Sequence, residues 1–169
     1  MGRYDCYLPH TLPEARLYTV LSQRSVSVTD PLILLVEDDP ESRDGYAEFL
    51  ERGGFRVTKS ANAEEAIAAL SRMVPDAIVT DITLPGKDGF EFAQEVRAHP
   101  QARHVPLLAM TGYWAADVHD RAMRAGITAT LLKPCQPEHL IAELNRVLQS
   151  SRGAVCRPVR STDRSVIEL

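Results

Sequence analysis

The chain has 169 residues, of which 44% are hydrophobic and 25% are charged, with a formal net charge of −4. This length and composition are typical of one soluble globular domain with tails, and the core is large enough to fold without metals or disulfides. The acidic balance argues against direct nucleic-acid binding, which usually needs a basic surface. Three cysteines without a CxxC spacing argue against a disulfide framework or a zinc site. Because the sequence has no membrane-spanning apolar run and no signal-peptide core, we expect a cytoplasmic protein without membrane attachment.

The two ends of the chain differ in character from its middle. Residues 1–30 contain two early prolines and end in the polar stretch SQRSVSVTDP, which predicts an N-terminal arm or linker with at most one short helix in PEARLYTVLSQ. Residues 151–169 carry four arginines without hydrophobic periodicity and predict a C-terminal tail. The folded domain is therefore expected within residues 31–150.

Strand-like and helix-like segments alternate five times in that middle region. The strands are expected at residues 32–37, 55–61, 76–81, 105–111 and 128–133. The helices are expected at residues 40–52, 63–73, 90–99, 115–126 and 137–150, the first beginning at Asp39-Pro40 and the second capped by Asn62. This order predicts an α/β fold with a doubly wound parallel sheet and helices on both faces. The second strand is the most polar, so we place it at an edge of the sheet.

Chemically reactive side chains follow four of the five predicted strands. Glu37 and Asp38 follow the first strand, and Asp81, Thr111 and Lys133 end the third, fourth and fifth strands. Ligands of doubly wound sheets bind beyond the carboxyl ends of the strands, so we expect these side chains to form one cluster. Clustered carboxylates repel one another unless a proton or a cation intervenes, and oxygen ligands suit Mg²⁺. A cation and an ammonium would together neutralise a phosphoryl group, with Asp81 as the nucleophile.

Four motifs carry a resemblance to a known family. They are VEDD (36–39), IVTDITLPGKDG (78–89), AMTG (109–112) and LLKP (131–134), and Thr111 and Lys133 follow Asp81 at intervals of 30 and 52 residues. In these features residues 31–150 resemble a response-regulator receiver domain of the stand-alone type. The resemblance implies a flavodoxin-like (βα)5 fold with a five-stranded parallel sheet in the order 2-1-3-4-5.

The resemblance also implies roles for individual residues. The catalytic set would be Asp81 as phosphoacceptor, Thr111 as the switch hydroxyl and Lys133 as the partner of the phosphoryl group, with the Lys133-Pro134 bond often cis. The Mg²⁺ set would be Glu37, acting largely through water, Asp38 and Asp81 as direct ligands, and the backbone carbonyl of Thr83.

The implied function is a phosphorylation-controlled signalling switch in a two-component or phosphorelay pathway. A sensor histidine kinase or a histidine phosphotransfer protein would donate the phosphoryl group. The chain would catalyse only its own phosphorylation and dephosphorylation, and would not be an enzyme in the usual sense. Because neither tail is long enough for a typical output domain, output would pass through a downstream protein, onward relay or a homodimer formed by the fourth helix, fifth strand and fifth helix.

Two positions bear on alternative readings. The family usually has an aromatic residue three positions before the lysine, and Thr130 stands there. This departure favours, as the alternative, a receiver-like binding module that signals without phosphorylation. Separately, we hypothesise that Tyr113, two residues after Thr111, shields the phosphoryl group from attacking water and so prolongs the phosphorylated state. A phosphatase of the aspartyl-phosphate type commonly has a second aspartate two residues after the nucleophile, but Thr83 occupies that position.

Overall fold

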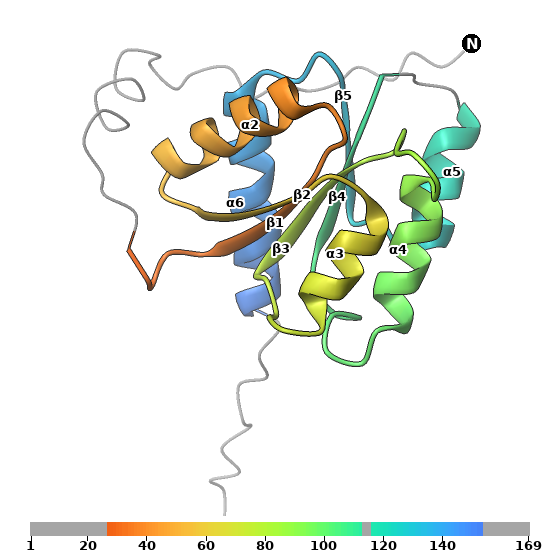
Figure 1. Ribbon diagram of the computed structural model, residues 1–169, viewed down its shortest axis with the longest axis horizontal. Helices are drawn as coiled ribbons and strands as arrows, with labels where there is room; N and C mark the ends of the chain where they lie inside the picture. The colour runs from red at the N-terminus through yellow and green to blue at the C-terminus, as the bar shows by residue number, and fades with distance from the viewer. Residues whose placement is uncertain (1–26, 113–115, 154–169) are drawn as a thin grey trace, which may run out of the picture.

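The computed structural model describes residues 27–112 and 116–153, and within them five parallel strands form one sheet in the order β2-β1-β3-β4-β5 (Figure 1). The strands are β1 (Leu32–Val36), β2 (Arg56–Ser60), β3 (Ala77–Asp81), β4 (Leu107–Thr111) and β5 (Ala129–Leu132). The helices are α2 (Pro40–Arg52), α3 (Ala63–Leu70), α4 (Gly89–Ala98), α5 (Ala116–Ala125) and α6 (Pro137–Gly153). The predicted fold class and strand order are confirmed, and β2 lies at an edge as its polarity indicated.

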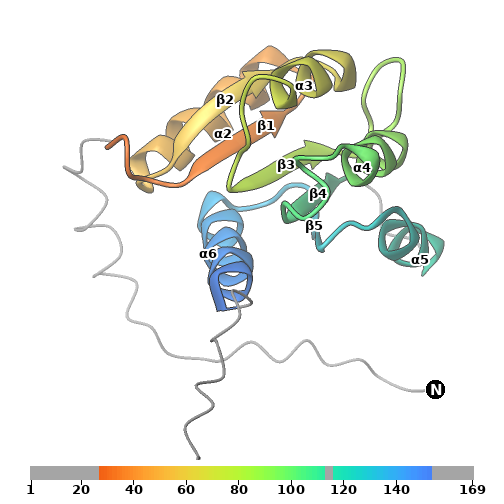
Figure 2. The same cartoon turned by 90° about the horizontal axis from the view of Figure 1, so that it is seen from below.

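The helices cover the sheet on both faces, with α2 and α6 on one face and α3, α4 and α5 on the other (Figures 1 and 2). Side chains of β1 alternate between the two layers, because successive residues of a strand point to opposite faces. Ile33 and Leu35 pack under α2 and α6, whereas Leu34 and Val36 pack under α3 and α4. All four are fully buried, and burial of each such side chain contributes about 1.5–3 kcal/mol. The apolar strands therefore form the middle of a two-sided core.

Helix caps fix how the chain leaves the strands. Asp39 is the N-cap of α2 and accepts a hydrogen bond from the Ser42 amide at 2.7 Å, and Asn62 caps α3 in the same way. Both predicted caps are confirmed. Asp88 is the N-cap of α4 and forms a capping box with Glu91. The Asp88 carboxylate accepts hydrogen bonds from two backbone amides in the first turn, and the Glu91 carboxylate accepts one from the Asp88 amide.

Several predicted boundaries differ from the observed ones. β4 begins at Leu107 instead of residue 105, because the Val105 amide closes a turn on Ala102 and Pro106 has no amide hydrogen. α6 continues to Gly153, so the start of the predicted tail is helical. The turn before β1 is also tied to the sheet, since the Arg56 guanidinium donates to the Val28 carbonyl at 3.0 Å.

The predicted helix near residue 20, the shielding residue Tyr113 and the tail from residue 154 onward lie outside the described residues. Across residues 27–112 and 116–153, no helix combines the length and apolar character needed to cross a membrane.

Candidate functional site

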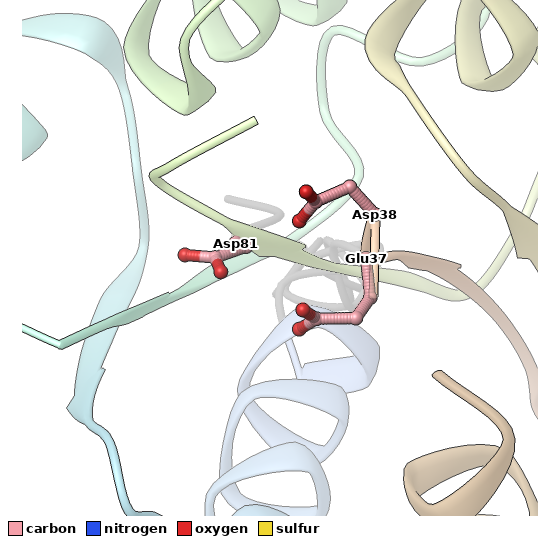
Figure 3. Close-up of side chains that lie close together, drawn as sticks. All are labelled: Glu37, Asp38 and Asp81. Carbon is pink, nitrogen blue, oxygen red and sulfur yellow. The ribbon is translucent and has the colours of Figure 1, made fainter. Parts of the chain in front are cut away.

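Three carboxylates meet at the carboxyl end of the sheet (Figure 3). Glu37 and Asp38 directly follow β1, and Asp81 is the last residue of the neighbouring strand β3. One oxygen from each residue lies within 4.8 Å of the others. Glu37 and Asp81 are 2% and 7% exposed, whereas Asp38 faces solvent. The topology therefore assembles the acidic cluster expected from the sequence, with one member open to an entering ion.

Lys133 joins this cluster from the far edge of the sheet. Its backbone amide donates to the Thr111 carbonyl at 2.7 Å, which extends the pairing of β4 and β5 by one residue. Its Nζ atom then lies 2.7 Å from Glu37 Oε2 and 2.6 Å from Asp81 Oδ2. The Lys133-Pro134 peptide bond is cis, the isomer that the resemblance implies. One ammonium thus bridges two buried carboxylates that come from different strands.

The electrostatics of the cluster favour additional positive charge. Burial raises the pKa of the Glu37 carboxyl above its usual range, although the nearby Lys133 partly opposes this effect. Burial lowers the pKa of Lys133, but its hydrogen bonds to Asp81 and Glu37 outweigh that effect and raise the pKa overall. When all four groups are ionised, three carboxylates and one ammonium leave two negative charges. This donor set of hard oxygens and this charge fit a divalent cation such as Mg²⁺.

The Asp81 carboxylate is also held from its own loop. The Thr83 amide donates to Asp81 Oδ1 at 3.0 Å. The observed contact of Thr83 is therefore made by its N–H, and the predicted role of its carbonyl as a metal ligand stays a prediction. With Lys133 on Oδ2 and Thr83 on Oδ1, both oxygens of Asp81 accept hydrogen bonds and its side-chain direction is fixed.

Thr111 ends β4 on the strand next to Asp81 and is 4% exposed. The structure thus brings Glu37, Asp38, Asp81, Thr111 and Lys133 to one end of the sheet, as the sequence predicted. Thr130 lies in β5 opposite Ala109 and is half-buried, so a small polar side chain occupies the position where the resembled family usually has an aromatic residue.

Two residues near the cluster were not predicted from the sequence. Arg43 of α2 donates to the carbonyl oxygens of Glu37 and Asp38. Gly89, the first residue of α4, packs so closely on the end of β3 that an added Cβ would lie 2.5 Å from the Asp81 carbonyl oxygen. The sequence offers only weak local signals for them, which are the Asp-Gly pair at a helix start and an arginine five and six residues after the acidic pair.

Comparisons with known proteins agree with this geometry. The family model described as the response regulator receiver domain matches residues 33–145. An uncharacterised 14.6 kDa protein of Leptolyngbya boryana is 39% identical over 109 residues, which cover 64% of this chain and 83% of that protein. Response regulator Rre1 of a Synechocystis species is 32% identical over 123 residues, which cover 72% of this chain. The chain spans about half the length of that relative, at 53%.

A solved structure with the same fold contains a magnesium ion. It is the receiver domain of sensor histidine kinase PA1611 from Pseudomonas aeruginosa, determined with a magnesium ion coordinated in its active-site cleft. Its TM-score is 0.64 at 34% identity, with 75% of this chain and 100% of that chain covered. The match of the family model, the sheet order and the acidic cluster lead to one conclusion: the chain belongs to the response regulator receiver domain family.

Proposed function

We propose that this protein is a phosphorylation-controlled switch of a two-component pathway, in which Asp81 accepts a phosphoryl group from a phosphohistidine. The observation that carries the proposal is the Lys133 ammonium 2.6 Å from Asp81 Oδ2, beside two further carboxylates. An aspartate with only a solvated surface role does not require a buried ammonium and two further carboxylates beside it. An aspartate that must hold a phosphoryl group needs cationic partners on either side of the new bond.

In the proposed reaction, a carboxylate oxygen of Asp81 forms a bond to phosphorus while the bond from phosphorus to the donor imidazole nitrogen breaks. The electron pair of the broken bond leaves with the imidazole. Asp38, Asp81 and, through water, Glu37 would hold Mg²⁺, which would supply charge neutralisation for the phosphoryl oxygens. Lys133 exchanges its bond to Asp81 for a bond to one of those oxygens. The Thr111 hydroxyl donates to another oxygen, and later attack of water on phosphorus restores the Asp81 carboxylate and releases phosphate.

The proposed donor is a sensor histidine kinase or a histidine phosphotransfer protein. One related receiver domain belongs to a sensor histidine kinase, which supports this class of partner. Output is proposed to pass through a partner protein, a homodimer or onward relay, and we assign no turnover of a separate substrate. The receiver-like module that signals without phosphorylation stays the second candidate, favoured by Thr130.

The test is the intact mass of the full chain after incubation with a small-molecule phosphodonor and Mg²⁺. The proposal predicts the gain of one phosphoryl group by the parent protein. It predicts no gain by Asp81→Asn, and no gain by the parent when a chelator removes the metal. A gain that persists in Asp81→Asn would assign the acceptor elsewhere, and a folded parent without any gain would favour the phosphorylation-independent module.

A further inference from the structure

Arg43 reaches from α2 back to the loop that supplies two of the three carboxylates. It is half-buried, and its Nη1 atom donates to the Glu37 carbonyl oxygen at 2.7 Å and to the Asp38 carbonyl oxygen at 3.1 Å. Hydrogen bonds from a charged donor are stronger than those between neutral groups, and the planar guanidinium restricts the direction of its partners. Arg43 therefore fixes two successive peptide groups, and these are the peptides of the acidic pair.

The three carboxylates differ in how their directions are fixed. Lys133 binds the carboxylate of Glu37, and Lys133 and Thr83 bind that of Asp81. The Asp38 carboxylate is exposed and has no hydrogen-bond or ion-pair partner among the residues that the structure describes. Even so, it points from the end of β1 toward Asp81 (Figure 3). The direction of this side chain therefore depends on its backbone. The Glu37 amide holds that backbone to the Ser60 carbonyl, and Arg43 is the side chain that binds the Glu37 and Asp38 carbonyls.

The start of α2 does not depend on Arg43. Asp39 already caps the helix through the Ser42 amide, and Pro40 stands at its first position. A role confined to beginning the helix is therefore filled by other residues. The bonds of Arg43 are directed instead at the residues just before the cap, where the chain turns from β1 into the site.

We infer that Arg43 is a positioning residue for the divalent-cation site, because it clamps the Glu37 and Asp38 carbonyls and so directs the Asp38 carboxylate toward Asp81. This inference rests on the proposed function, since it concerns the metal that phosphoryl acceptance requires. Residues that orient metal ligands without touching the metal commonly change affinity by one to two orders of magnitude when they are replaced.

The test is the dissociation constant of Mg²⁺ measured by titration calorimetry on the full chain, for the parent, Arg43→Gln, Arg43→Lys and Arg52→Gln. Arg52 is the matched control, because it lies on the same helix and its only recorded partner in the described part of the chain is Glu48, on the solvent-exposed surface. We expect Mg²⁺ binding about tenfold weaker for Arg43→Gln, an intermediate value for Arg43→Lys, which retains a donor, and an unchanged value for Arg52→Gln. Hydrogen exchange without metal supplies a second readout, with faster exchange near residues 37–39 expected for Arg43→Gln.

The outcomes separate the inference from the proposed function. If the parent does not bind Mg²⁺, the proposed function fails. If the parent binds Mg²⁺ and a folded Arg43→Gln binds it equally well, the inference is wrong and the proposed function stands. If Arg43→Gln does not fold, Arg43→Lys decides, and parental affinity in that variant would overturn the inference.

Discussion

Replacing Lys133 with methionine tests the electrostatic design of the site. The change removes the ammonium that bridges Glu37 and Asp81, whose side chains are only 3% and 9% exposed, and keeps most of the aliphatic stem. Removing one partner from a buried ion pair costs about 3–5 kcal/mol. Lys133 is 22% exposed, and Glu37 is able to take up a proton, so we expect a loss below this range, of about 2 kcal/mol, at neutral pH without metal.

The pH dependence of this loss has a defined sign. Burial raises the pKa of Glu37 above 4.5 even with Lys133 present, and loss of the lysine raises it further. The native state of the variant then binds more protons than the unfolded state, so its stability falls as the pH rises from about 4.5 through the raised pKa. The difference between the variant and the parent should therefore be largest at neutral pH and smaller in mild acid. Mg²⁺ should also reduce the difference, because the site without the ammonium is more negative and binds the cation more tightly, so that the ion stabilises the folded variant more than the folded parent.

Urea unfolding in the presence of a chelator, at neutral pH and at about pH 5.5, measures these differences. Lys59→Met is the matched control, because Lys59 makes a 2.8 Å ion pair with Asp44 in which both side chains are 48% exposed or more. Loss of such a surface pair should change stability by about 0–1 kcal/mol. If Lys133→Met were as stable as the parent at neutral pH without metal, or if its defect did not depend on pH, Lys133 would not stabilise the two buried carboxylates in the folded state.

Two further predictions concern the scaffold. Gly89→Ala should destabilise by about 1–3 kcal/mol and slow phosphoryl acceptance, because its Cβ would lie 2.5 Å from the Asp81 carbonyl oxygen. Gly45→Ala is the control, because no neighbouring atom lies within 4 Å of the new Cβ, and it should stabilise the helix by about 0.5–1 kcal/mol. If thermal unfolding showed that both substitutions stabilise the protein, or that both destabilise it, the steric explanation for Gly89 would be wrong. Arg97→Ala should destabilise the protein by about 2–4 kcal/mol, because four hydrogen bonds from the guanidinium to backbone carbonyls, two of them to Gly126, would be lost. Urea unfolding measures this change, and a loss below about 0.5 kcal/mol would show that these hydrogen bonds do not stabilise the fold.

The sequence predicted the sheet because its signals are local and repeated. Apolar runs of strand length alternate with capped helices, and the polarity of β2 alone placed that strand at an edge. The cluster at the carboxyl ends could be predicted from the topology, because the carboxyl ends of parallel strands lie at the same edge of the sheet for any loop conformation. Residues as distant in sequence as Glu37 and Lys133 were therefore expected to meet, and they lie 2.7 Å apart.

Other features depend on three-dimensional packing and have no local signal strong enough to predict them. The contact of Gly89 with the Asp81 backbone depends on how closely α4 approaches β3. The hydrogen bonds of Arg43 to the Glu37 and Asp38 carbonyls depend on the side chain turning back across the start of α2, and the sequence does not specify that direction. The bridge that Lys133 makes between Glu37 and Asp81 also depends on side-chain packing, because the strand order predicts only that the three residues share one edge of the sheet.

The most direct test of Asp81 as the phosphoacceptor is to locate the phosphoryl group in the chain. After phosphorylation with Mg²⁺, borohydride reduces an aspartyl-phosphate to the alcohol, and tandem mass spectrometry of the digested chain identifies the altered residue. We expect homoserine at position 81 and at no other aspartate, dependent on both the phosphodonor and the metal. Reduction at Asp38 or at another acid, or a stable label on a hydroxyl or imidazole group with Asp81 unaltered, would contradict it.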